Sequence, residues 1–122
     1  MAKASLLEKT VRVDKQQIIK FQISTYCFFN NIQLSNNELD CLTLLAAYGQ
    51  YELSEFCNIS VDENIFKSPQ TVRNFFTRTC SLGLTIKEGT TKKTIEIAPK
   101  LQVLIKGNII LNYKIIYVTK EQ

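Results

Sequence analysis

A chain of 122 residues, 45% of them apolar, has enough material for one hydrophobic core, so we expect a single domain over residues 1–122. A charged fraction of 21%, with four glycines and two prolines, excludes a disordered, collagen-like or low-complexity chain. The net charge of +4 is unevenly spread: residues 1–33 hold five basic and two acidic side chains, residues 34–66 hold six acidic and no basic ones, and residues 67–122 hold ten basic and three acidic ones.

The N-terminal segment, Met1 to Thr10, holds only a short apolar patch and lacks the apolar stretch of about 7–15 residues that a signal peptide needs. No apolar run in the sequence approaches the roughly 18–20 residues of a membrane-spanning helix. We therefore expect a cytoplasmic protein that makes no membrane contact.

The first predicted elements are a short strand at Thr10–Val13 and a helix over Lys15–Asn31. Asp14 is placed to cap this helix, and Gln17, three residues on, is placed to return a hydrogen bond to the cap. Apolar residues recur at helical spacing from Ile19 onward, although the many β-branched and aromatic residues of the segment leave a strand open as the alternative.

A second capping box, Ser35-Asn-Asn-Glu38, predicts the start of a helix whose apolar stripe continues as far as Gly49. Tyr51–Asn58 has its apolar residues on one side and predicts a short helix. Ile59–Phe66 is polar and acidic and predicts a connection, which is longer than the turn of about three or four residues that usually joins two such helices.

Ser68-Pro69 predicts a helix start, because Ser68 can cap the first free amides and Pro69 stands where a missing N–H costs nothing. Gly83 predicts the end of this helix. The residues at intervals of three and four, which predict its buried face, are Val72, Phe75, Phe76 and Cys80.

The remaining predicted elements are strands. Two short β-rich runs, Leu84–Lys87 and Thr94–Ala98, predict a hairpin with a basic tip at Glu88–Lys93. Ile109–Val118 predicts a further strand, which pairs either with Leu101–Ile105 or with the N-terminal strand.

This order of a helix, a short helix, a connection, a capped helix and a basic hairpin resembles a winged helix-turn-helix. The string KSPQTVRNFFTRTCSLGLTIK, from Lys67 to Lys87, is similar to the recognition helix and first wing strand of bacterial, plasmid and phage winged-helix regulators. The resemblance covers residues 35–98. It implies an α+β, mainly helical fold, to which residues 10–33 add an N-terminal strand and helix and residues 109–118 add a C-terminal strand or hairpin.

The resemblance also implies binding of double-stranded DNA by a regulator of transcription or replication, with the second helix in the major groove and the wing on a flanking backbone. The outward positions of this helix carry side chains suited to base edges, while its N-terminus and the hairpin lysines are suited to phosphates. The predicted DNA-binding residues are Lys67, Ser68, Gln70, Thr71, Arg73, Asn74, Thr77, Arg78, Lys87, Lys92 and Lys93.

Catalysis and metal binding lack their usual residues. The sequence contains no histidine, and its cysteines, Cys27, Cys41, Cys57 and Cys80, are at least 14 positions apart. The common zinc ligand sets and any Ser-His-Asp or Cys-His arrangement are therefore missing. We expect no enzymatic activity, no metal and no cofactor, and we expect buried, reduced thiols in preference to disulfides.

The alternative function is that of a non-enzymatic protein-interaction module, since the same scaffold makes protein contacts in polymerase subunits and virion assemblies. The abundance of Ile, Asn and Lys is typical of an AT-rich genome, and the chain resembles small phage-encoded proteins, which implies a phage or polymerase partner in the host cytoplasm or the virion. Most regulators of this type are dimers. We therefore expect a homodimer or homo-oligomer that forms through the N-terminal helix or the C-terminal strand.

Overall fold

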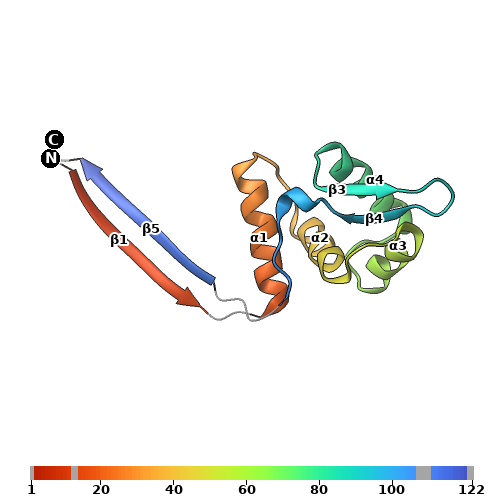
Figure 1. Ribbon diagram of the computed structural model, residues 1–122, viewed down its shortest axis with the longest axis horizontal. Helices are drawn as coiled ribbons and strands as arrows, with labels where there is room; N and C mark the ends of the chain where they lie inside the picture. The colour runs from red at the N-terminus through yellow and green to blue at the C-terminus, as the bar shows by residue number, and fades with distance from the viewer. Residues whose placement is uncertain (1, 12–13, 107–110, 121–122) are drawn as a thin grey trace.

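The computed structural model describes residues 2–11, 14–106 and 111–120, which form a helical body and a two-stranded arm (Figure 1). The elements in chain order are β1 (Ala2–Val11), α1 (Lys15–Phe29), α2 (Asn36–Tyr48), β2 (Tyr51–Glu52), α3 (Leu53–Asp62), α4 (Pro69–Ser81), β3 (Thr85–Glu88), β4 (Thr94–Ile97), the short 3-10 helix η1 (Pro99–Leu101) and β5 (Leu111–Lys120). The predicted α+β, mainly helical class is confirmed, and α2, α3, α4 and the hairpin β3–β4 have the order of a winged helix-turn-helix.

Helix α1 begins as its capping residues predict. The Gln17 amide donates to the Asp14 carboxylate at 2.9 Å, and the Asp14 amide donates to the Gln17 side chain at 3.4 Å. The helix ends at Phe29, with Asn30 as its C-cap, so the strand alternative for this segment is wrong. The cap and the buried stripe that includes Ile19 and Ile23 outweigh the low helix propensity of the β-branched residues.

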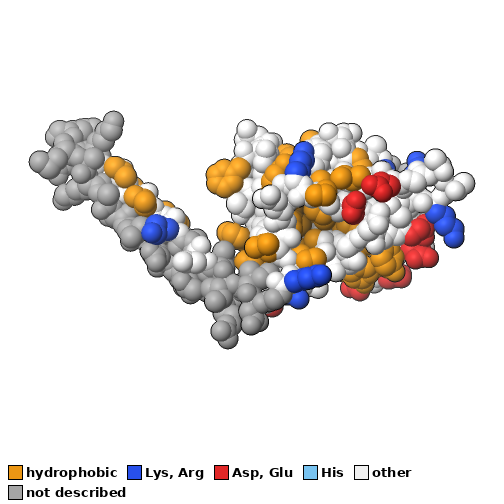
Figure 2. Space-filling view, in the orientation of Figure 1, with side chains coloured by type: hydrophobic (Ala, Val, Ile, Leu, Met, Phe, Trp, Pro, Cys, Tyr) orange, Lys and Arg blue, Asp and Glu red, His pale blue; other side chains and the backbone are white. Residues whose placement is uncertain are grey.

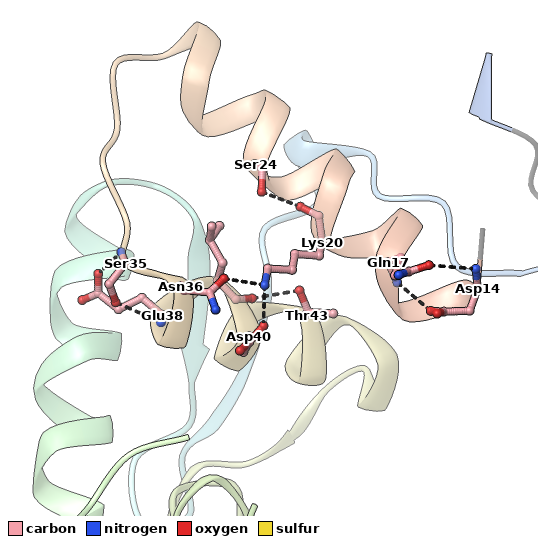
Figure 3. A network of polar contacts seen from close by, with 10 residues as sticks. Asp14, Gln17, Lys20, Ser24, Ser35, Asn36, Glu38, Asp40 and Thr43 are labelled. Atoms are coloured by element: carbon pink, nitrogen blue, oxygen red, sulfur yellow. Dashed lines mark hydrogen bonds and ion pairs between the residues drawn. The ribbon is translucent and has the colours of Figure 1, made fainter. Parts of the chain in front are cut away.

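Helix α2 also begins at the predicted capping box, in which Ser35 and Glu38 satisfy each other's backbone amides. Lys20 joins α1 to this helix, because its ammonium donates to the Asn36 side chain at 2.6 Å and forms an ion pair with Asp40 at 2.9 Å (Figure 3). Gly49 ends α2 with φ = 76°, a conformation that a residue with a Cβ rarely adopts. The two predicted helix boundaries of α2 are thus confirmed.

The core lies between α1, α2, α3, α4 and the small sheet. Phe56 of α3 and Phe76 of α4 are fully buried, with ring centroids 5.7 Å apart, and Tyr48 and Tyr51 pack against Phe56 from the side. Helices α1, α2 and α4, strand β4 and the residue just before β3 supply the other fully buried large apolar side chains: Ile19, Ile23, Leu42, Leu45, Val72, Leu84 and Ile95. One continuous core therefore fixes α4 against the rest of the body.

The predicted helix over Tyr51–Asn58 is wrong at both of its ends, since α3 begins at Leu53 and ends at Asp62. Tyr51–Glu52 forms strand β2 instead of helix, because it pairs with β4 of the hairpin, and the Glu52 carboxylate caps α3 by accepting from the Ser54 amide. The helix α3 then continues to Asp62, and the hydroxyl of its buried residue Ser60 donates to the Phe56 carbonyl. The connection to α4 is therefore only residues 63–68.

Helix α4 starts after Ser68 and Pro69 as predicted, and it ends at Ser81 just before Gly83. Its buried face differs from the prediction at one position, because Thr79 is fully buried and Cys80 is half-buried. The Thr79 hydroxyl is satisfied inside the core by the Phe76 carbonyl and by the hydroxyl of Thr85 on β3. A polar residue can therefore occupy the inner face, which apolar periodicity does not reveal.

The body contains a three-stranded antiparallel sheet in the order β2-β4-β3. The predicted hairpin is confirmed as β3 and β4, and Pro99 follows its second strand at the start of η1. The third strand, β2, was not predicted. It pairs Tyr51 with Ile95 and attaches the hairpin to the start of α3.

The arm consists of β1 and β5, which pair antiparallel along ten residues each, from Ala2 opposite Lys120 to Val11 opposite Leu111. The predicted strand at residues 10–13 is part of β1, although residues 12 and 13 lie outside the described residues, as do residues 109 and 110 of the predicted C-terminal strand. Of the two predicted partners for the C-terminal strand, the N-terminal strand is confirmed and residues 101–105 are excluded. Within the described parts of the chain, no helix is long and apolar enough to cross a membrane.

Candidate nucleic-acid interface

The solvent-facing side of α4 is a row of short hydrogen-bonding side chains. Spacings of three and four residues put Gln70, Asn74, Thr77 and Ser81 on one side of the helix, and all four are exposed. The side-chain amide of Gln70 donates to the side-chain oxygen of Asn74 at 2.9 Å, and the Thr77 hydroxyl donates to the Arg73 carbonyl. The row presents amide and hydroxyl groups to solvent, whereas the opposite side of α4 is core.

The N-terminus of α4 is organised by Ser68. Its hydroxyl accepts from the Thr71 amide at 3.2 Å and contacts the Thr71 hydroxyl at 2.9 Å. Lys67 and Gln70 are exposed beside this end of the helix, where the positive end of the helix dipole favours an anion. A phosphate group placed here would meet polar side chains and a lysine.

Arg73 and Arg78 lie on the two flanks of the row and are both engaged within the protein. The Arg73 guanidinium donates to the Ser54 hydroxyl of α3 at 2.6 Å. Arg78 forms an ion pair with Glu38 of α2 at 3.0 Å, and its guanidinium lies 5.9 Å from the centre of the Phe75 ring. The structure therefore places these two predicted DNA contacts at the sides of α4, where neighbouring helices hold them.

Sequence reasoning missed Ser54 and Glu38 as partners of the two arginines. Ser54 is 19 positions from Arg73, and Glu38 is 40 positions from Arg78, so no local pattern relates the members of either pair. Glu38 has a second role, since the same carboxylate completes the capping box of α2. Its position is therefore set by the helix cap, and Arg78 reaches to it.

The hairpin β3–β4 supplies the other predicted lysines. Lys87 of β3 reaches the α4 row, where its ammonium donates to the Thr77 hydroxyl at 3.4 Å. Lys92 and Lys93 are exposed at the tip of the hairpin. The tip end of the hairpin is attached to the start of α3, because the Leu53 amide donates to the Lys93 carbonyl at 2.8 Å. The hairpin and the row are thus parts of one continuous surface.

Acidic side chains border this surface. Asp62 and Glu63 are exposed at the C-terminal end of α3, and Glu88 is exposed at the end of β3. Figure 2 shows acidic and basic side chains interspersed on the end of the body that carries the hairpin. The surface is therefore mixed in charge. What distinguishes the α4 row from the rest of this surface is its hydrogen-bonding side chains more than its charge.

The cysteines are free thiols, as expected. Cys27, Cys41 and Cys57 are buried, and Cys80 is half-buried. Burial raises the pKa of Cys41 to about 12, and it raises the pKa of Cys27 and of Cys57 as well. Within the described residues, no group of three or more His, Cys, Asp or Glu side chains is placed to hold a metal ion.

The fold is similar to that of a solved structure, the ferric uptake regulator of Helicobacter pylori, which is described as having three functional metal-binding sites. The superposition has a TM-score of 0.51 at 12% sequence identity, and it covers 84% of this chain and 73% of that chain. At this identity the likeness concerns the fold alone. No protein-family model and no curated protein sequence matches the chain.

Proposed function

We propose that this protein binds double-stranded DNA, with α4 in the major groove and the hairpin β3–β4 along the flanking backbone, and that it regulates transcription or replication. The observation that carries the proposal is the exposed row of Gln70, Asn74 and Thr77 on α4, beside which Lys87 is held. Asn and Gln side chains match the major-groove edge of adenine, and a Thr methyl group matches that of thymine.

The short connection between α3 and α4 also supports the proposal. With α3 continuing to Asp62, six residues (63–68) separate the two helices, which is nearer to the usual turn of about three or four residues than the predicted connection was. The resemblance to the ferric uptake regulator supports the same type of function, since that protein is named as a regulator. All the residues predicted from the sequence to contact DNA remain part of the proposed site.

The first test is fluorescence anisotropy of labelled random-sequence duplex DNA at several salt concentrations. If Lys67, Lys87, Lys92 and Lys93 each neutralise one phosphate, the slope of log affinity against log salt should be about −4. Lys92→Ala is expected to weaken binding to every sequence and to make the slope shallower by about 1. The matched control is Lys15→Ala on α1, which removes the same charge from an exposed position outside the proposed site.

Specific contacts are tested on a duplex selected from a random pool. Gln70→Ala is expected to weaken binding to that duplex by about 1–3 kcal/mol and to relax its sequence preference, whereas Gln16→Ala on α1 should change neither. No binding at the lowest salt concentration, or equal effects of the two glutamine variants, would contradict the proposal. The protein-interaction module would then be the better account of the fold.

The ion pair between Arg78 and Glu38 gives a second prediction. Glu38→Gln keeps a side chain that can complete the α2 capping box, but it removes the negative charge that holds Arg78. We expect this variant to bind DNA severalfold more tightly, because Arg78 no longer has to leave an ionic partner and an acidic group is removed from the site.

The matching variant, Arg78→Ala, is expected to weaken DNA binding by about 1–3 kcal/mol while changing stability little, since a half-exposed ion pair contributes only about 0–1 kcal/mol. Thermal unfolding of both variants by circular dichroism separates the two effects. A large loss of stability in Arg78→Ala, with DNA affinity unchanged in Glu38→Gln, would show that the pair is structural.

A further inference from the structure

The arm exposes large apolar side chains on both of its faces. Four consecutive residues of β5, Ile115, Ile116, Tyr117 and Val118, are between 54% and 61% exposed. Because successive side chains of a strand point to opposite faces, each face of the arm carries two of them. A two-stranded ribbon is at best marginally stable in water without a third strand or a helix against it. The arm therefore lacks a covering surface.

Helix α1 has an apolar face that is also uncovered. Phe28 and Phe29 are each 76% exposed, and Phe21, two turns earlier on the same side, is 46% exposed. Leu104, 64% exposed, is held beside this helix, because the Gln22 side chain bonds to both the amide and the carbonyl of Leu104 at 2.7 and 2.9 Å. We call these four apolar residues the α1 face.

A hollow of about 320 Å³ adjoins the α1 face, lined by Phe21, Gln22, Thr25, Tyr26, Leu101 and Gln102. It lies between α1 and the chain that follows η1, so its walls are a helix and a short irregular segment. The α1 face is therefore a ridge of aromatic rings beside a depression. A ridge beside a hollow can accommodate an extended segment that bears large side chains.

Within one copy, the arm and the α1 face do not cover each other. Figure 1 shows the arm extending away from the end of the body that α1 forms, and Figure 2 shows hydrophobic side chains both on the arm and at that end of the body.

We propose that two copies of this chain form a dimer with two-fold symmetry by exchanging arms, so that β5 of each copy lies on the α1 face of the other. A second copy is the occupant that supplies both missing surfaces at once, since each chain has one uncovered arm and one uncovered helix face. The symmetry makes the two contacts identical, so both α1 faces are covered and the assembly closes at two copies.

The area is sufficient for a stable dimer. At about 150–200 Å² for each large apolar side chain, covering the two β5 residues on one face of the arm and the four residues of the α1 face in both copies removes roughly 1,100–1,500 Å² of exposed surface. Specific interfaces of standard size bury about 1,200–2,000 Å². The two exchanged contacts therefore reach the lower part of this range without any rearrangement of the core.

The dimer is tested by sedimentation velocity of the full chain over a range of concentrations. The expected species has a mass of about 28 kDa, twice the 14.0 kDa of one chain. An arm variant, Ile116→Ser with Tyr117→Ser, and an α1 variant, Phe28→Ser with Phe29→Ser, should each raise the dissociation constant on the order of 100-fold or more. Leu82→Ser, which alters an exposed apolar residue of the body outside both surfaces, should leave the dimer intact.

Mixing the two variants tests the exchange itself. In a heterodimer of the two variants, the unaltered arm of the α1 variant can lie on the unaltered α1 face of the arm variant, so one contact stays intact. In a homodimer of either variant, both contacts contain an altered surface. We therefore expect the mixture to associate more tightly than either variant alone. Because all altered residues are exposed, the variants should fold, and circular dichroism melting curves verify this.

A fluorescent probe identifies what covers the α1 face. The sequence contains no tryptophan, so Phe28→Trp reports this position alone, and its emission should shift to the blue as the protein is concentrated. A monomer with blue-shifted emission at every concentration would mean that the arm covers its own α1. A dimer that the α1 variant does not weaken would mean that the arms pair with each other or that another surface is used. Either result would overturn the proposal.

Discussion

Replacing Phe76 with alanine is expected to lower the free energy of unfolding by about 3–5 kcal/mol, the largest effect of any single substitution considered for this protein. The Phe76 ring is fully buried and lies against Phe56 and Phe75, with centroids 5.7 and 5.6 Å away. Its removal leaves a cavity at the point where α3 and α4 meet. Urea unfolding followed by circular dichroism measures the loss.

The matched control for this variant is Leu82→Ala, which truncates an exposed apolar residue just after the same helix. We expect it to change stability by no more than about 1 kcal/mol, because 40% of its surface is already in contact with water. Equal losses in the two variants would contradict the orientation of α4, on which the exposed row of Gln70, Asn74 and Thr77 also depends.

Stability is expected to fall as the pH rises above 9, and Cys41 is expected to be a main cause. Burial raises the pKa of this thiol from 9.0 to about 12 in the folded protein. A group whose pKa is raised on folding contributes fully below its unfolded pKa and loses that contribution as the pH rises toward its folded pKa. Between pH 9 and pH 11 the loss from Cys41 is about 2–3 kcal/mol.

The measurement is urea unfolding of the wild type and of Cys41→Ser at pH 7, 9, 10 and 11. Serine keeps a side chain that can bond to Ser60, as the Cys41 thiol does at 3.8 Å, but it does not ionise in this range. Cys27, Cys57 and other groups titrate in both proteins. The difference between the two slopes of unfolding free energy against pH therefore reports the contribution of Cys41 alone. Identical slopes of unfolding free energy against pH above pH 9 would show that folding does not raise the pKa of Cys41.

Local sequence signals predicted much of this fold because they act over a few residues. The capping boxes at Asp14 and Ser35 and the Ser68-Pro69 start were confirmed, since a cap is made by side chains next to the amides they satisfy. The hairpin β3–β4 was also confirmed, because its strands are joined by a short loop. In these cases the interacting residues are near neighbours in the chain.

Long-range contacts account for the errors. Residues 51–52 look helical beside the apolar residues that follow, but pairing with β4, more than 40 positions later, makes them a strand. The end of α3 was predicted too early because the buried hydroxyl of Ser60 counts as polar in a sequence pattern, whereas the Phe56 carbonyl satisfies it in the core. Thr79 was missed on the buried face of α4 for the same reason.

By itself, the sequence determined the starts of α1, α2 and α4, the buried face of α4 apart from Thr79 and Cys80, the basic hairpin and hence the winged-helix order of the elements. These depend on capping chemistry and on periodic burial, which are properties of short segments. Only the tertiary structure decided that Arg73 and Arg78 are held by Ser54 and Glu38, that β5 pairs with β1, and that the arm and the α1 face are both left uncovered. Each of these depends on residues distant in sequence meeting in space, where burial and partner geometry set the outcome.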